Sequence, residues 1–493
     1  MNVKRAGPAK GGVMRGAMIG YGSGGFSAGR CAAALAAALM LTGAASGAAP
    51  SIGDPYPSTY RPLPSRTVVI TGATLLDGRG QQIDKGSILL SGGKIVAVGA
   101  DIPVPADAEV IDGTGKWVTP GIIDVHSHVG NGPMPEVVGA DSVNEFVGPV
   151  TAEVWAEHGV LVQDPAFSRA AAGGVTAMQI LPGSGNLFGG RTVVLKTVPA
   201  RTVQDMKFPG APYGLKMACG EIPTMSYNSA NHAYGTKGER PATRMGNFAI
   251  YRATWIKAQE YRAAWAAYDK AKAMGAKGLT APERDLTLET LAGVLGGDIR
   301  VHMHCHRADE MALVMSMARE FGYHVSAFHH AVEAYKIPDL LKREAVCAAM
   351  WSDWWGYNME SYDGVPQNIG LVHQAGGCAM IHSDHSVAIQ HLNQEGAKAR
   401  AAAHRMDIDI SRADAWKWMS YNPATALGIA DRTGSLEPGK MADVVLWSGD
   451  PFSVYTHSEK VFVDGAIVYD RGDPASRWVS DFELGQSGAG DRK

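Results

Sequence analysis

The chain has 493 residues, of which 46% are hydrophobic and 19% are charged, enough for a large core and more than one domain. Its formal net charge of −3 provides no basic field of the kind that nucleic-acid-binding proteins carry, so nucleic acid is excluded as an expected partner. The 60 glycines and 26 prolines fit the many short turns of an α/β protein.

The first 49 residues have the layout of a secretory signal. Basic residues within 4–30 precede an apolar stretch at 31–41, and small residues follow at 43–49. The apolar stretch is too short to span a bilayer comfortably. We therefore expect cleavage between Ser46 and Ala49, a periplasmic or secreted protein without a membrane span, and a linker at 50–65. The alternative is a disordered leader rich in alanine and glycine.

Short strands separated by glycine turns occupy residues 66–118, and a matching set returns at 431–475. Each set alone is too small and too rich in strands to bury both of its faces. This pattern predicts one small, discontinuous β-sandwich domain built from both chain ends. A flexible polar tail is expected at 476–493.

The middle of the chain, residues 119–430, alternates short apolar strands with helical stretches. Clear helical patterns occupy 243–274, 307–320 and 412–421. Repeated strand–helix units of this length favour an α/β fold with a parallel (β/α)₈ barrel of the TIM type. In such barrels the functional groups lie at the carboxyl ends of the strands.

Two histidines stand one residue apart at the end of the first predicted barrel strand. The apolar run at 122–125 predicts a short buried strand, and His126 and His128 follow it. Side chains alternate along a strand, so both imidazoles point the same way, about 6.5–7 Å apart along the backbone. Two convergent imidazoles suit a borderline metal such as Zn²⁺. The alternative, a pair of unrelated histidines, would also have to explain three ligand-type positions on later strands.

Those three positions are His304, His330 and Asp384, each at the end of a later predicted strand. His304 is chosen as a ligand because it ends the strand at 300–303, and His306 or Arg307 is expected to meet substrate. Asp384 can contact a metal and accept a proton from metal-activated water, although a helix N-cap is an alternative role. Imidazoles and a carboxylate leave open positions for water and substrate, as a catalytic site requires.

This set resembles the amidohydrolase superfamily in order and strand context. The segments at 72–78, 422–428 and 434–445 resemble its opening and closing signatures, so the likeness runs from about residue 66 to 470. The segments at 181–190 and 214–221 look typical of the imidazolonepropionase-related branch, which also holds secreted Xaa-Pro and other dipeptidases.

The resemblance implies one or two divalent ions, Zn²⁺ being expected, and a bridging anion on the fourth strand. That anion is usually a carboxylated lysine and sometimes a glutamate. Lys216 resembles the lysine by its context, whereas Glu221, just beyond the strand, is favoured because it lies nearer the mouth. Lys196 is a distant third. Without a bridge, the site would hold one metal.

Around the metals, Arg244 is a candidate to grip a substrate carboxylate, with a structural salt bridge as an equal alternative. Trp351 is a candidate for an aromatic wall, together with Trp354, Trp355 and Tyr357, with loop packing as the alternative. The aromatic stripe from Tyr251 has helical spacing and is expected to be core or a partner face.

Cys219, Cys305, Cys347 and Cys378 would remain after cleavage of the leader. None forms a C-x-x-C pair, so the sequence predicts that most of them are buried free thiols and not part of a disulfide framework or a zinc knuckle.

These observations predict an exported, metal-dependent hydrolase that cleaves an amide bond with metal-activated water. Dipeptides, Xaa-Pro peptides and N-acyl amino acids are the expected small-molecule or short-peptide substrates, and a homo-oligomer is possible. A deaminase or cyclic-amide hydrolase on the same scaffold is the alternative, since fold does not settle substrate. A catalytically dead binding protein is less favoured, because the four histidines and Asp384 are all present.

Overall fold

A computed structural model describes residues 54–135, 138–227, 241–353, 359–474 and 478. The predicted leader and most of the predicted tail lie outside these residues. Among the helices that are described, none is both long enough and apolar enough to cross a membrane.

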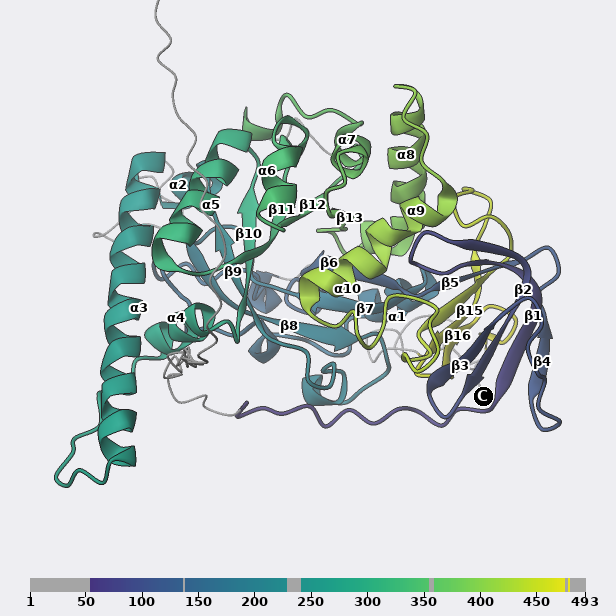
Figure 1. Cartoon of the computed structure of the whole chain (residues 1–493), viewed down its shortest axis with the longest axis horizontal. Helices are drawn as coiled ribbons and strands as arrows, with labels where there is room; N and C mark the ends of the chain where they lie inside the picture. Colours follow the sequence, from purple (N-terminus) through teal and green to yellow (C-terminus); the bar gives the residue numbers. More distant parts are fainter. Residues whose placement is uncertain (1–53, 136–137, 228–240, 354–358, 475–477, 479–493) are drawn as a thin grey trace, which may run out of the picture. The chain divides into compact units, whose positions relative to one another are not determined.

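An eight-stranded sheet forms the centre of the fold, and its strands follow one another in chain order (Figure 1). Every position of its first strand, β6, is buried. The strands are β6 (Ile122–Ser127), β7 (Val175–Ile180), β8 (Phe188–Lys196), β9 (Gly214–Ala218), β10 (Arg300–Cys305), β11 (Val325–His330), β12 (Cys347–Met350) and β13 (Ala379–Ile381). Together with solved relatives described below, this sheet supports a TIM-type barrel.

One strand departs from the all-parallel barrel that the sequence predicts. Strand β8 pairs antiparallel with both β7 and β9, whereas the other neighbours in the sheet pair in parallel. The connection at 181–187 explains the difference, because it is too short for the crossover that two parallel strands need.

The two ends of this sheet are joined by side-chain and backbone hydrogen bonds. The backbone N–H of Asp384 donates to the carbonyl of His126 over 3.0 Å. The backbone N–H of Ser383 donates to Oδ1 of Asp124 over 3.2 Å, and the Ser383 hydroxyl donates to Oδ2. Burial raises the pKa of Asp124 to about 7, although these hydrogen bonds oppose the shift. The seam brings the ends of β6 and β13 together.

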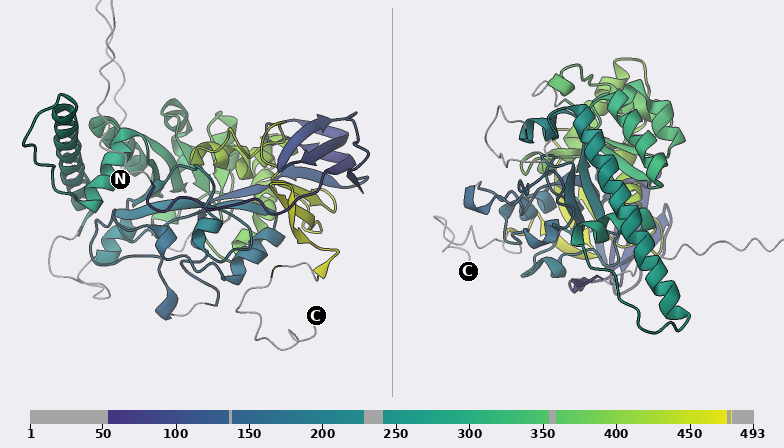
Figure 2. Two further views of the ribbon diagram at one scale, coloured as in Figure 1. Left: turned by 90° about the horizontal axis from the view of Figure 1, so that it is seen from below. Right: turned by 90° about the vertical axis from the view of Figure 1, so that its left-hand side faces the viewer.

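Helices cover the barrel sheet, and side-chain caps mark where several of them begin (Figures 1 and 2). Thr243 accepts a hydrogen bond from the N–H of Gly246 and starts the longest helix, while Gly322 ends another in the left-handed conformation. The helices are α1 (Pro165–Ala172), α2 (Glu221–Tyr227), α3 (Arg244–Ala273), α4 (Leu286–Gly296), α5 (Ala308–Phe321), α6 (Pro338–Arg343), α7 (Asn368–Gln374), α8 (Leu392–His404), α9 (Arg412–Trp416) and α10 (Tyr421–Leu427).

A second eight-stranded sheet contains strands from both ends of the chain. Strand β5 pairs in parallel with β1 and antiparallel with β14, so the N-terminal and C-terminal sets meet there. The sheet buries its own apolar cluster, which includes Ile70, Leu90 and Phe462. Its strands are β1 (Val68–Leu76), β2 (Gln82–Ser91), β3 (Lys94–Gly99), β4 (Glu109–Asp112), β5 (Trp117–Pro120), β14 (Val444–Trp447), β15 (Ser458–Val463) and β16 (Ala466–Asp470).

Lys196 connects β8 to this second sheet. Its buried ammonium lies 3.2 Å from Asp443 and 2.7 Å from Asp464, which also accepts a hydrogen bond from the Tyr60 hydroxyl. A buried charge is tolerated only when it is paired. Lys196 therefore has a structural pairing and does not face the histidines.

The prediction that most of these cysteines are free thiols is wrong. Cys219 is bonded to Cys305, and Cys347 is bonded to Cys378. Each bridge joins residues at matching ends of neighbouring barrel strands, whose proximity depends on the sheet and not on spacing along the chain. A spacing rule for C-x-x-C pairs could not detect them.

We expect thiol labelling under denaturing, non-reducing conditions to leave these four cysteines unmodified. Reduction should lower the free energy of unfolding by about 2–4 kcal/mol for each bridge, because the unfolded chain gains conformational freedom. Thermal melts of the Cys347→Ser/Cys378→Ser variant, with and without reductant, isolate one bridge. Complete labelling of all four thiols without reductant would contradict the assignment.

Candidate metal centre and active site

Three side chains at the seam of the barrel form a compact triangle. The Nε2 atoms of His126 and His128 lie 3.3 Å apart, and each is 3.2 Å from Oδ1 of Asp384. Ligand atoms around a tetrahedral zinc ion with bonds of about 2.0–2.1 Å are separated by about 3.3 Å. The spacing of the triangle thus matches one face of a metal coordination shell, and the carboxylate faces the histidines instead of capping a helix.

The other ring nitrogen of each histidine in the triangle is held by a hydrogen-bond partner. His128 Nδ1 lies 2.8 Å from the carbonyl of Leu181. His126 Nδ1 lies 2.9 Å from Nδ1 of His329, whose Nε2 lies 2.9 Å from Nδ1 of His302. Such outer contacts fix the ring orientation of metal-binding histidines and leave the inner nitrogen for the ion.

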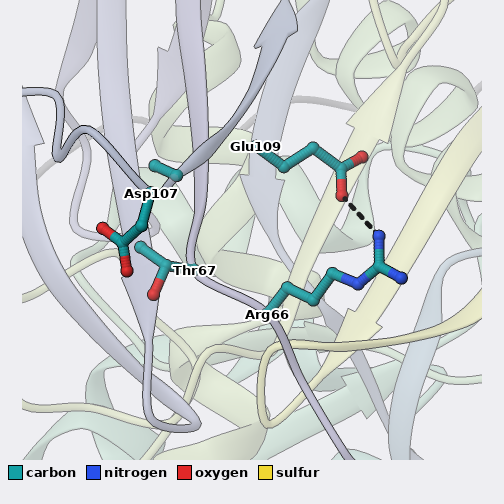
Figure 3. A pocket seen from close by; sticks show the side chains of 5 residues that line it. Arg66, Thr67, Asp107 and Glu109 are labelled. Carbon is teal, nitrogen blue, oxygen red and sulfur yellow. Dashed lines mark ion pairs between the residues drawn. The ribbon is translucent and has the colours of Figure 1, made fainter.

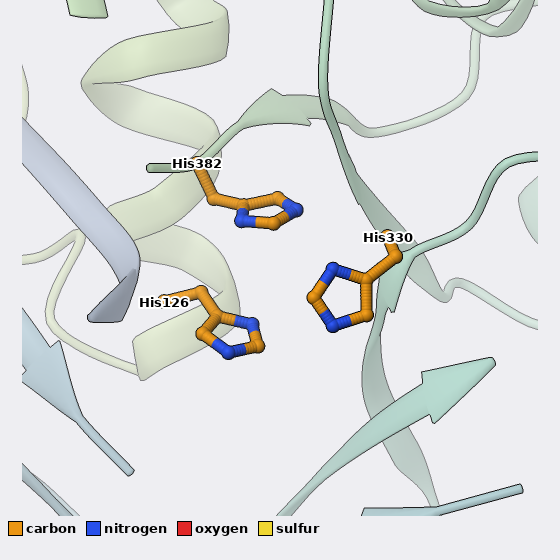
Figure 4. A group of neighbouring side chains, drawn as sticks. All are labelled: His126, His330 and His382. Atoms are coloured by element: carbon orange, nitrogen blue, oxygen red, sulfur yellow. The ribbon is translucent and has the colours of Figure 1, made fainter. Parts of the chain in front are cut away.

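A second group of imidazoles adjoins the triangle. Ligand atoms of His126, His330 and His382 all lie within 4.8 Å of one another, and Figure 4 shows the three rings turned towards a common space. The ring centroids of His304 and His330 are 4.5 Å apart. His330 Nδ1 lies 3.8 Å from Oδ2 of Asp384, so the two groups share this carboxylate.

Several buried nitrogens in this group have no hydrogen-bond partner among the described residues. They are both ring nitrogens of His304 and His382, and Nδ1 of His330. Burial lowers the pKa of all three imidazoles, that of His382 to about 3, so the rings are neutral at pH 7. Neutral, buried imidazoles with free lone pairs are what a divalent metal requires, and this donor set fits one.

Asp384 is ionised in this setting. Burial alone would raise its pKa, but the hydrogen bond from His128 and the nearby imidazoles of His330 and His382 lower it well below its usual value. The side chain retains 23% exposure, so water can reach the carboxylate.

Lys216 points into the histidine cluster, whereas Glu221 does not. The ammonium of Lys216 is fully buried and has no hydrogen-bond partner in the described chain. Burial lowers its pKa to about 7, and it interacts electrostatically with Asp384. Glu221 instead accepts a hydrogen bond from the backbone N–H of Glu360 over 3.1 Å. The geometry favours Lys216 over Glu221 as the position of a bridging anion.

Two of the predicted ligands have strained backbones. The φ angles of His330 and Asp384 are +68° and +53°, in the left-handed region. This conformation costs a non-glycine residue about 1–2 kcal/mol. Strain of this kind persists where the surrounding structure enforces it, and it is concentrated at functional sites.

The predicted substrate contacts lie in different surroundings. Trp351 is buried and stacks on His330, with centroids 4.4 Å apart, so it forms one wall of the histidine site. His306 is buried beside His304, with centroids 4.5 Å apart. Arg307 pairs with Asp309 on the surface. Trp354, Trp355 and Tyr357 lie outside the described residues.

Arg244 pairs with a carboxylate of its own chain. Its guanidinium lies 3.3 Å from Oε1 of Glu360 and is 52% exposed. The aromatic stripe that begins at Tyr251 is partly core, since Tyr251 and Trp255 are fully buried.

Sequence reasoning left His382, His329 and His302 without a role. His382 stands two residues before Asp384, the same alternation that identified His126 and His128, so its signal was present. His329 and His302 lie side by side only because β10 and β11 pair in register. No local pattern could identify their contact.

A surface hollow of about 550 Å³ lies elsewhere, on the second sheet (Figure 3). Its lining includes Arg66 and Glu109, which are 3.8 Å apart and well exposed. An exposed ion pair of this kind contributes little binding energy, and the hollow has no convergent buried groups.

Comparison with known proteins identifies the family. The amidohydrolase family pattern matches residues 232–469. The crystal structure of an amidohydrolase from Thermotoga maritima MSB8 is 33% identical, with a TM-score of 0.72, over 82% of this chain and 100% of that chain. The chain belongs to the amidohydrolase superfamily. Among curated proteins, the imidazolonepropionase of Pseudomonas putida is 25% identical over 408 residues, covering 76% of this chain and 90% of that protein.

This amidohydrolase therefore falls in the imidazolonepropionase-related branch of the superfamily and is a hydrolase. It is also 30% identical over 407 residues to amidohydrolase tasK of Hapsidospora irregularis. That match covers 78% of this chain but only 40% of tasK, so the chain spans less than half of the length of that relative.

We expect Lys216→Ala to lower the amount of bound divalent metal per chain, because it removes the buried amine that faces the histidines. Glu221→Ala is the matched control and should retain metal. Atomic-emission analysis of the purified, dialysed variants measures both. Metal loss in Glu221→Ala but not in Lys216→Ala would reverse the assignment.

Proposed function

We propose that this chain is an exported, zinc-dependent amidohydrolase that cleaves an amide bond in a dipeptide, an Xaa-Pro peptide or an N-acyl amino acid. The observation that carries the proposal is the triangle of His126, His128 and Asp384 beside the unpartnered nitrogens of His304 and His330. Hydrolysis of an amide by this set needs only water as a second reactant.

In this proposal His126, His128, His304 and His330 would hold the divalent ions, and Lys216, carboxylated to a carbamate, would supply a further anionic ligand. A divalent ion at such a site polarises a carbonyl oxygen and makes water a stronger nucleophile. The lowered pKa of Lys216 supports the carbamate, because only a neutral amine reacts with carbon dioxide.

Asp384 is the proton carrier in this mechanism. Its carboxylate is ionised and partly exposed, so it can accept a proton from the attacking water. The protonated carboxyl then donates that proton to the leaving nitrogen, which departs as a neutral amine. Trp351 limits access of bulk water by covering His330.

Two features support export. The N-terminal layout is that of a cleaved signal, and disulfides form and persist in oxidising compartments.

A cyclic amide is the second candidate substrate. The likeness to imidazolonepropionases, which extends over 76% of this chain, favours it, since their names specify an imidazolone. The two candidates differ in the product, because ring opening produces a single molecule and dipeptide cleavage produces two.

The proposal is tested by assaying the purified protein with dipeptides, Xaa-Pro peptides, N-acyl amino acids and cyclic amides after metal analysis. We expect release of a free amine from at least one acyclic amide, abolished by a chelator and restored by Zn²⁺. Turnover of cyclic amides alone would support the second candidate. Chelator-insensitive turnover would exclude the metal-dependent mechanism.

We expect Asp384→Asn to reduce kcat by about 10²–10⁴-fold or more, the range usual for loss of a general acid–base. The fold should persist, because the amide replaces the carboxylate with little change in shape, and most of the metal should remain. Circular dichroism and metal analysis control for folding and loading. Near-normal turnover would remove Asp384 from the mechanism.

A further inference from the structure

Three carboxylates that have no role in the proposed chemistry gather beside the histidine site. Glu221 begins α2, Glu310 lies in the first turn of α5, and Glu360 lies in the 3₁₀ turn Met359–Ser361. Glu310 and Glu360 are 3% and 5% exposed. Carboxylates are rarely buried to this extent unless a partner compensates for their lost hydration.

The compensation that Glu310 receives from the described residues is incomplete. Neither of its carboxylate oxygens has a basic or amide donor there, and its neighbour is a second acid, Glu360, with which it can form a hydrogen bond only when one of the two is protonated. Burial and, to a smaller extent, the adjacent charge of Glu360 raise its pKa to about 8. Leaving a buried acceptor unpaired costs free energy of folding, so this side chain is a candidate contact for a ligand.

Glu360 reaches this position because Gly220 has no side chain. A Cβ atom at Gly220 would lie 2.2 Å from Oε2 of Glu360, and the φ angle of Gly220 is +81°. Oε1 lies 3.3 Å from the Arg244 guanidinium, whereas Oε2 has no hydrogen-bond partner in the described part of the chain. The backbone is thus arranged to place a second unpaired carboxylate oxygen here.

The charge of this cluster is unbalanced. Arg244 faces Glu310 and Glu360, and it is half exposed. Arg307 is bonded to Asp309 at the surface. One guanidinium thus stands against three acidic side chains, and a cation that approaches them would favour their ionised forms.

His306 connects the carboxylates to the histidine site. Its Nδ1 lies 3.9 Å from Oε2 of Glu360, and its ring centroid lies 4.5 Å from that of His304. A single imidazole ring, that of His306, therefore lies between the carboxylates and the predicted metal ligands. A substrate whose cationic group is a few bonds from its scissile amide could reach both.

We propose that Glu310 and Glu360 bind a positively charged nitrogen of the substrate, an ammonium or a guanidinium group. This inference rests on the proposed amide hydrolysis and names its substrate class. An organic cation fits better than a metal ion, because within the described residues the close sets of three metal-ligand atoms occur at the histidines and not at these carboxylates. The cation is either an α-amino group or a basic side chain.

Calorimetric titration of the metal-loaded protein with L-lysine, L-norleucine, Nα-acetyl-L-lysine and Nε-acetyl-L-lysine tests the proposal without turnover. We expect L-lysine to bind at least tenfold more tightly than L-norleucine or Nε-acetyl-L-lysine if the site binds a side chain. If it binds the α-amino group, Nα-acetylation should cause that loss instead. In either case Glu310→Gln should lower the affinity for the preferred ligand at least tenfold.

Asp309→Asn is the matched control, since it removes an exposed carboxylate from the same turn and should leave these affinities unchanged. Glu360→Gln provides a second variant if Glu310→Gln fails to fold. Equal binding of all four probes, or unchanged affinities in both glutamine variants, would overturn the proposal, as would a divalent ion that is lost only from these variants. If the protein binds the charged probes selectively but hydrolyses no amide, the proposed function is contradicted, whereas the proposed cation site is still supported.

Discussion

The arrangement of this site depends on the burial of histidine side chains away from water. His126, His304, His330 and His382 are each no more than 2% exposed, and burial is the largest cause of their lowered pKa values. Neutral rings packed face to edge have lone pairs that protein donors do not satisfy. A divalent cation would satisfy several such lone pairs at once, so the burial of these rings and the proposed metal binding are two aspects of one arrangement.

Hydrogen bonds at the barrel seam hold Asp384 in position beside the buried histidines. Asp124 holds the end of β13 through Ser383, and that contact places Asp384 against His126 and His128. Asp384 has a left-handed backbone, which costs about 1–2 kcal/mol, and its N–H donates a hydrogen bond to the carbonyl of His126 at the same seam. The position of Asp384, the proposed proton carrier, thus depends on the buried carboxylate of Asp124.

The barrel strands and their terminal histidines were predictable, because strand period and strand ends are local properties of the sequence. The antiparallel β8, the two disulfides and the His126–His329–His302 contacts were not, since each depends on which strands become neighbours. The preference for Glu221 over Lys216 assumed that distance along the strand measures distance from the site. A lysine side chain is long enough to extend from deeper in β9 towards the site, and the buried ammonium of Lys216 is close enough to Asp384 to interact with it electrostatically.

A disulfide bond connects the strand ends that carry the acidic cluster and the histidine site. The bridge between Cys219 and Cys305 joins the residue before Gly220 to the residue between His304 and His306. Gly220 allows the close approach of Glu360, while His306 lies between Glu360 and the histidine site. Any change in the spacing of β9 and β10 would therefore move the carboxylates relative to the imidazoles. A covalent bond at this point keeps the acidic cluster and the histidine site at one separation, as the proposed recognition of a substrate by both its cation and its amide would require.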